Sequence, residues 1–125
     1  MRRPVYIGVF LTGESRNKLL RAFPPVHADV KADHITLVFK PSDSDLAGFE
    51  IGKRVQIEVV GYAVDQKGQA VATRLPLDLR SRSKNKDPHI TVSVSPGTKP
   101  VYSNTLLAKG PVQPTKTLIL EGVLD

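Results

Sequence analysis

The chain has 125 residues, a net charge of +6 from eighteen basic and twelve acidic residues, and no cysteine. This length is enough for one domain with its own core, and the absence of cysteine excludes disulfides and thiolate metal sites. The positive charge favours a polyanionic partner such as RNA. No stretch reaches the roughly 20 apolar residues that span a membrane, and the apolar run 5–11 is too short for a signal peptide. We therefore expect a single cytoplasmic domain over residues 1–125.

The N-terminal part of the chain predicts a strand, a helix and a second strand. Residues 5–11 are mostly apolar, as in a buried strand. Thr12 or Ser15 can cap a short helix, which ends at the two prolines 24–25 because proline disfavours helical geometry before it and lacks a backbone donor. β-Branched and apolar residues then predict a strand at 34–40.

The rest of the chain predicts a hairpin, a further strand, a helix and a closing strand. Two polar segments predict loops, 41–52, which has room for at best one helical turn, and 75–88. The elements between and after them are strands at 53–64, 69–74, 89–94 and 115–123, with a turn at 65–68 and a helix at 103–109. Roughly seven strands and two short helices make an α+β domain.

One tripeptide, His-Ile-Thr, occurs at 34–36 and again at 89–91, each time inside a predicted strand. Side chains of a strand alternate between its two faces. This alternation predicts one histidine-bearing face in each strand, formed by His34, Thr36 and Val38 in the first and by His89, Thr91 and Ser93 in the second. Phe39 is expected on the opposite, apolar face. The repeat predicts two pseudo-symmetric lobes of antiparallel sheet, each giving one motif strand to a central cleft.

The repeated triplet also indicates catalysis. A single strand histidine most often has only a structural role, and threonine follows β propensity. Here, however, two of the three histidines stand in the same triplet. A pair of imidazole and hydroxyl groups is what acid–base chemistry on a phosphate ester requires.

His34-x-Thr36 and His89-x-Thr91 resemble the paired His-x-Thr/Ser motifs of the 2H phosphoesterase superfamily. That superfamily includes 2′,3′-cyclic nucleotide phosphodiesterases, 2′-5′ RNA ligase-like proteins and the cyclic phosphodiesterase domain of fungal and plant tRNA ligases. The run 88–92, followed by 99–100 and 103–104, is most similar to the last of these. The motif spacing and the chain are shorter than is usual in the superfamily.

The resemblance implies a 2′,3′-cyclic phosphodiesterase of RNA repair or tRNA splicing that opens the ring to leave a 2′-phosphate. In-line displacement at phosphorus needs a base on one side and an acid on the other, so His34 and His89 are the expected catalytic pair, in either order. Thr36 and Thr91 are expected to donate hydrogen bonds to the non-bridging oxygens. This scheme requires no metal and no cofactor.

Other polar residues are weaker candidates for substrate binding. Tyr6 can stack a base or line the cleft, with core packing as the alternative. Ser93 extends the histidine face towards phosphate. His27 lacks the threonine and is expected at the surface. The basic segment 80–86 is either a solvated loop or a mobile flap that meets RNA phosphates, through Arg80, Arg82, Lys84 and Lys86.

The expected partner is RNA with a 2′,3′-cyclic phosphate end or a cyclic nucleotide, and we expect a monomer. Two alternative functions stay open at this point. One is a 2′-5′ RNA ligase-like phosphodiesterase that acts on 2′-5′ linkages or small cyclic nucleotides. The other is a non-catalytic module that binds RNA ends, although the intact motif pair argues against it.

Overall fold

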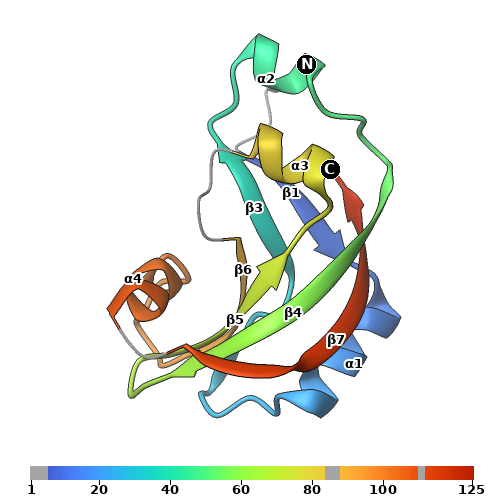
Figure 1. Cartoon of the computed structure of the whole chain (residues 1–125). Helices are drawn as coiled ribbons and strands as arrows, with labels where there is room; N and C mark the ends of the chain where they lie inside the picture. Colours follow the sequence, from blue (N-terminus) through green and yellow to red (C-terminus); the bar gives the residue numbers. More distant parts are fainter. Residues whose placement is uncertain (1–5, 84–87, 110–111) are drawn as a thin grey trace.

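The structure is a computed structural model, and it describes residues 6–83, 88–109 and 112–125. Within these ranges seven strands form one antiparallel sheet of order β2-β6-β5-β4-β7-β1-β3 (Figure 1). The strands are β1 (Tyr6–Leu11), β2 (Asp29–Val30), β3 (His34–Phe39), β4 (Arg54–Val64), β5 (Gly68–Arg74), β6 (His89–Val94) and β7 (Gln113–Leu124). The helices in the described part are α1 (Gly13–Ala22), α2 (Asp43–Ala47), α3 (Leu77–Arg82) and α4 (Tyr102–Lys109).

The long strands β4 and β7 form the middle of the sheet. The β1–β3 pair adjoins β7, and β5, β6 and β2 follow on the other side of β4. The sheet curls, so that β3 approaches β6 although the two are not neighbours in the sheet (Figure 1). This curvature brings the two motif strands together.

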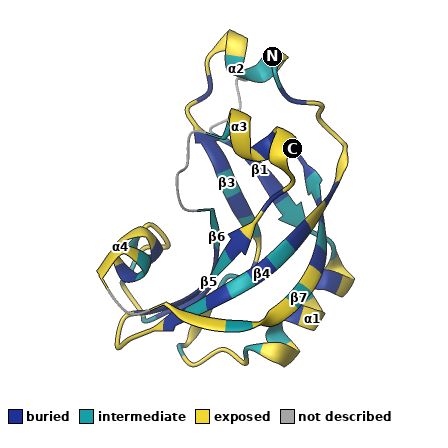
Figure 2. Cartoon of the chain, viewed as in Figure 1, coloured by how far each residue is buried: buried dark blue, intermediate teal, exposed yellow. Residues whose placement is uncertain are grey.

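One main core fills the apolar face of the sheet. Strand residues with β-branched or leucine side chains make up most of it, and Leu19 of α1 joins them. The isoleucine of each triplet, Ile35 and Ile90, is fully buried there. Figure 2 shows buried positions concentrated in the strands and exposed ones in the helices and turns. A smaller cluster forms where Leu106 of α4 packs on Ala63 and Ala70.

The two motif strands carry the same irregularity. Thr36 pairs with Gly8 but Val38 pairs with Ile7, so Leu37 is an extra residue on β3. Thr91 likewise pairs with Ala70 and Ser93 with Gln69, so Val92 is extra on β6. Each strand therefore bulges directly after its threonine, and a bulge moves the following side chains to the other face.

The bulges correct the prediction of which residues share a face. Val38 and Ser93, expected beside the histidines, are turned the other way and are 2% and 0% exposed. Phe39, expected in the core, is 64% exposed. The strict alternation assumed from the sequence holds only up to the threonine of each triplet.

Most predicted elements are confirmed within a few residues. The predicted cap of α1 is present, since the Thr12 hydroxyl accepts a hydrogen bond from the Ser15 backbone N–H at 3.2 Å. Helix α2 (Asp43–Ala47) corresponds to the single helical turn allowed in the segment 41–52, whereas β2 and α3 are not predicted by the sequence. Helix α3 replaces part of the predicted loop, so Arg80 and Arg82 are helical, whereas Lys84 and Lys86 lie outside the described residues.

The predicted pair of lobes is not seen as two separate sheets, because all seven strands belong to one. In the part of the chain that the structure covers, no helix is long and apolar enough to cross a membrane.

Candidate active site

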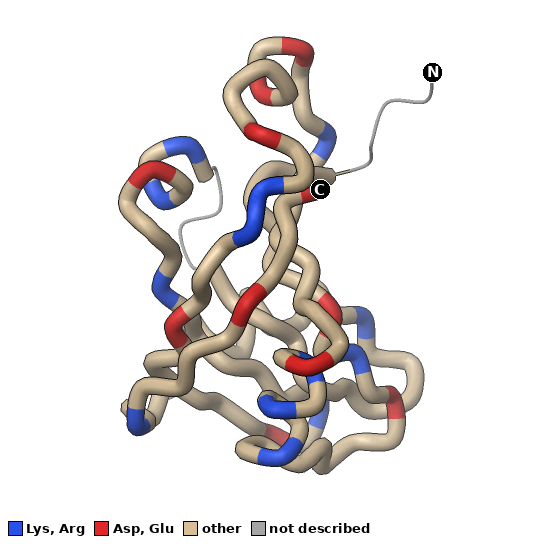
Figure 3. The backbone as a smooth tube through the Cα atoms, turned by 90° about the vertical axis from the view of Figure 1, so that its right-hand side faces the viewer, with Lys and Arg blue, Asp and Glu red and all other residues tan. Residues whose placement is uncertain are grey.

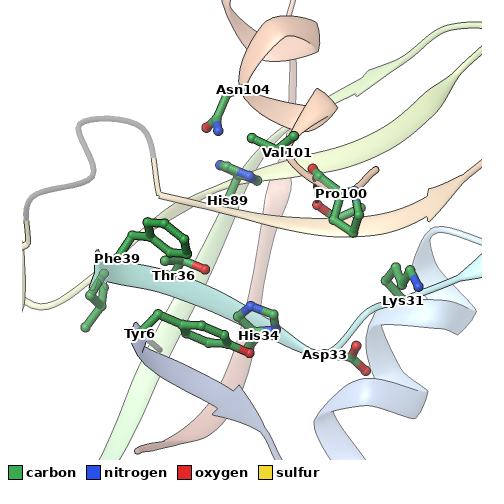
Figure 4. Close-up of a pocket in the computed structure, with 12 residues that line it drawn as sticks. Tyr6, Lys31, Asp33, His34, Thr36, Phe39, His89, Pro100, Val101 and Asn104 are labelled. Atoms are coloured by element: carbon green, nitrogen blue, oxygen red, sulfur yellow. Dashed lines mark hydrogen bonds between the residues drawn. The ribbon is translucent and has the colours of Figure 1, made fainter. Parts of the chain in front are cut away.

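A cavity of about 650 Å³ contains all four polar side chains of the two triplets. His34 and Thr36 reach it from β3, and His89 and Thr91 reach it from β6. The start of α4 provides a further wall through Pro100, Val101 and Asn104 (Figure 4). The structure thus brings together the residues that the repeat predicted as catalytic.

The imidazole of His34 packs against two aromatic rings of β1. Its ring centre lies 4.9 Å from that of Tyr6 and 5.1 Å from that of Phe10. Burial lowers the pKa of His34 below its ordinary value and the nearby charge of His89 lowers it further, while the carboxylate of Asp33 opposes both. A lowered pKa keeps the imidazole neutral at neutral pH, as a general base must be.

Gly8 allows this stack to form. It lies between Tyr6 and Phe10 on the same face of β1, opposite Thr36. A methyl group at Gly8 would come within 2.6 Å of the Ile35 carbonyl oxygen. The absence of a side chain here lets β1 approach β3 closely.

The hydroxyl of Thr91 is bound to the start of α4. It donates to the Pro100 carbonyl oxygen at 3.3 Å and lies 2.7 Å from the Ser103 hydroxyl. Ser103 is the second residue of this helix and is 1% exposed. Ser103 therefore holds the Thr91 hydroxyl from behind the cavity wall. Sequence patterns give no signal for this contact, because it depends on where α4 packs on β6.

Charged side chains of opposite sign lie at one end of the cavity. Figure 4 shows Lys31 and Asp33 there and Phe39 towards the other end. Lys31 also forms an ion pair of 3.3 Å with Asp29. No group of three or more His, Cys, Asp or Glu side chains in the described ranges is arranged to hold a metal ion.

Tyr6 lines the cavity and is not packed in the core, which was the alternative from the sequence, and its ring is occupied by the stack on His34. Burial, and secondly the charge of Asp33, raise the pKa of Tyr6 above its ordinary value. Its phenol therefore stays protonated at neutral pH.

Other predicted site residues lie elsewhere. Ser93 is fully buried on the opposite face of β6, where its hydroxyl donates to the Gln69 side chain at 2.6 Å and accepts from the His27 backbone N–H at 3.2 Å. Arg80 and Arg82 do not line the cavity, and Arg82 donates to the Gly48 carbonyl oxygen. Ser93 is thus a structural residue that anchors the segment before β2.

No protein-family model and no curated protein sequence matches the chain. Among solved structures, the fold is similar to that in the crystal structure of a fungal RNA kinase, with a TM-score of 0.66 and 14% sequence identity. The similarity covers 98% of this chain and 45% of that protein, so the chain spans less than half of its length. At this identity the comparison establishes the fold alone, which is shared with part of the fungal RNA kinase.

Proposed function

We propose that this protein is a metal-independent 2′,3′-cyclic phosphodiesterase that converts a cyclic phosphate at an RNA or nucleotide end to a 2′-phosphate. The observation that supports this most is the equivalence of the two triplets. Both stand at the same register of an antiparallel pair, before the same bulge, and their four polar side chains line one cavity. The β1–β3 and β5–β6 pairs are then pseudo-symmetric halves of one site.

In this proposal His34 is the general base and His89 the general acid. Neutral His34 takes a proton from water as the water oxygen bonds to phosphorus. The bond from phosphorus to the ribose 3′ oxygen breaks, and His89 gives its proton to that oxygen. The lowered pKa of His34 supports this order of roles. The 2′ oxygen keeps the phosphate.

Thr36 and Thr91 donate hydrogen bonds to the non-bridging oxygens of the phosphate, where negative charge builds in the transition state. A hydroxyl donor aimed at this position stabilises the transition state more than the ground state. The one hydroxyl proton of Thr91 goes to the Pro100 carbonyl oxygen in this structure, so Thr91 donates to phosphate only when the substrate takes the place of that carbonyl, while the Ser103 hydroxyl donates to Thr91.

The test uses an RNA oligonucleotide with a 2′,3′-cyclic phosphate end, incubated with the protein in excess EDTA. We expect a 2′-phosphate product at the same rate with and without EDTA. His34→Ala and His89→Ala should each lower turnover by about 10²- to 10⁴-fold, as for other acid–base residues. His27→Ala is the matched control, because the third histidine bonds the Asp65 carbonyl oxygen outside the cavity.

A near-normal rate in either cavity-histidine variant would contradict the two-histidine mechanism. A requirement for an added divalent ion would contradict the metal-independent assignment. A parallel incubation with a 2′-5′-linked dinucleotide separates the proposed reaction from the ligase-like alternative.

A further inference from the structure

The chain itself joins the two edges of the sheet. In the strand order β2 lies at one edge and β3 at the other, yet only residues 31–33 separate them in sequence. β2 pairs with β6, which carries His89, and β3 carries His34. Residues 31–33, called the link below, therefore tie the edge beside one histidine to the edge that bears the other.

Backbone hydrogen bonds hold the link on β6. The Lys31 N–H donates to the Val92 carbonyl oxygen at 2.9 Å. The Ala32 N–H donates to the Thr91 carbonyl oxygen at 2.8 Å. The two acceptors are the threonine of the second triplet and the extra residue of the bulge that follows it. The link is thus bonded to β6 at the point where the second triplet ends.

The link is also bonded on its other side. The Asp33 carbonyl oxygen accepts a hydrogen bond from the Leu11 backbone N–H of β1 at 2.9 Å. The Lys31 carbonyl oxygen accepts from the Arg16 guanidinium of α1 at 3.3 Å. Figure 4 shows Lys31 and Asp33 on the segment that leads into the first triplet. Both halves of the cavity are therefore bonded to the same three residues.

Ala32, in the middle of the link, has an unusual backbone conformation. Its φ is 53°, in the left-handed region that alanine seldom adopts. Its side chain is fully buried in the main core. A residue stays in such a conformation only where its surroundings fix it, and residues of this kind gather at functional sites. The hydrogen bonds on either side of Ala32 are what fixes it here.

We propose that Lys31 and Ala32 are positioning residues, whose backbone bonds to β6 set the separation of His34 and His89 across the cavity. This inference rests on the proposed function, in which the two imidazoles act on opposite sides of one phosphorus atom. A displacement of about 1 Å in such a site can lower the rate by about 10²-fold.

The first test compares Lys31→Pro with Lys31→Ala. Both variants remove the ammonium and its ion pair with Asp29, but only proline also removes the N–H that donates to Val92. Val30, before it, is in an extended strand, which is the conformation that a following proline favours. With adenosine 2′,3′-cyclic phosphate, kcat should be up to about 10²-fold lower in Lys31→Pro than in Lys31→Ala, at similar KM.

The second measurement reports the separation of the histidines without any turnover. The charge of His89 lowers the pKa of His34, and this influence weakens as the distance grows. An NMR titration gives the His34 pKa with His89 present and with His89→Gln. The difference between these two pKa values should be smaller in the Lys31→Pro protein than in the Lys31→Ala protein.

Val55→Ala is the control for a general loss of stability. Val55 is a buried core residue of β4 that does not line the cavity. Its truncation should lower Tm and leave both kcat and the pKa difference at their wild-type values.

Ala32→Val and Ala32→Gly form a second pair, which decides the question if Lys31→Pro does not fold. Glycine adopts a φ of 53° readily, whereas a β-branched residue is strongly disfavoured there. The valine variant should therefore show the lower kcat and the smaller pKa difference of the two.

An equal pKa difference in Lys31→Pro and Lys31→Ala would overturn the proposal, whatever the rates. With an unfolded proline variant, equal values in Ala32→Val and Ala32→Gly would overturn it. If the wild-type protein does not hydrolyse the cyclic ester, the proposed function is wrong, and the link is judged by the NMR titrations alone.

Discussion

At His34, burial and the nearby charge of His89 lower the pKa, and the Asp33 carboxylate raises it. Burial disfavours the charged imidazolium and is the larger influence, while the Asp33 carboxylate favours it. The net direction is downward from the ordinary histidine value of about 6.5. A histidine that acts as general base loses activity only when the pH falls low enough to protonate it. The acid limb of the kcat/KM profile should therefore lie below about pH 6.5.

Asp33→Asn should lower the His34 pKa further, because it removes the charge that stabilises the imidazolium. The acid limb of kcat/KM should move to lower pH, and an NMR titration of the His34 ring should move with it. Asp78 of α3 forms an exposed ion pair with Lys53, and Asp78→Asn is the control. It should leave the acid limb of kcat/KM and the His34 titration unchanged. A shift to higher pH in Asp33→Asn would show that the carboxylate does not act on His34 as a charge.

The lowered pKa also has a consequence for folding stability. Because the unfolded state binds the proton more readily than the folded state, His34 contributes fully to stability above about pH 6.5. That contribution is lost as the pH falls from there towards the folded-state pKa.

At the scale of the element, the close approach of β1 to β3 depends on one glycine. Gly8→Ala should displace the two strands, because the new methyl group meets the Ile35 backbone oxygen at 2.6 Å and backbone cannot yield as a side chain can. Overpacking of this kind typically costs about 1–3 kcal/mol. We expect a lower Tm, and a loss of turnover because His34 moves with Ile35.

Gly13→Ala provides the matched control for this change. Gly13 begins α1, and a methyl group there would meet nothing within 4 Å. Alanine is the better helix former, so this variant should be at least as stable as wild type and fully active. Unchanged thermal unfolding in Gly8→Ala would mean that the strands can separate without cost.

The paired bulges show where sequence patterns cease to predict an element. Alternating side chains predict both motif strands and the correct faces for each histidine and threonine. A bulge, however, is an extra residue relative to a partner strand, and β1 and β5 are distant in sequence from β3 and β6. Because strict alternation ignores the bulges, it predicts Phe39 in the core and Ser93 on the face towards the phosphate.

At the scale of the whole molecule, basic and acidic residues are interspersed along the described chain (Figure 3). Arg80 and Arg82 lie on α3 outside the cavity. If the proposed function holds, attraction of RNA by these two arginines and chemistry at the phosphate should therefore be separable.

Arg80→Gln with Arg82→Gln should weaken binding of an RNA oligonucleotide while leaving hydrolysis of a cyclic mononucleotide unchanged. Each lost phosphate contact should also flatten the log–log salt dependence by about 0.7 for single strands. Lys18→Gln with Arg21→Gln removes the same charge from α1 and is the control. Equal effects of both double variants would mean that only net charge matters and that α3 makes no specific contact.

Much of the fold and of the site could be predicted because the signals are local. The Thr12 cap, the β4–β5 hairpin and the two triplets each lie within a few consecutive residues. Ser103 and the cavity wall of α4 could not be predicted, because they depend on packing between separate elements. The insertion of β7 between β1 and β4 is likewise a pairing across most of the chain.

That insertion decides when the sheet becomes continuous during synthesis. β7 is the last strand in chain order among the described residues, and it fills the gap in the sheet between β1 and β4. A second connection does not involve β7, because the backbone N–H groups of Lys31 and Ala32, just before β3, donate to the Val92 and Thr91 carbonyl oxygens of β6. On the ribosome, the facing edges of β1 and β4 stay open until β7 emerges, and open edges invite wrong partners. A nascent chain that stops short of β7 therefore carries both motifs and the contact of residues 31–32 with β6, but its sheet is still open between β1 and β4.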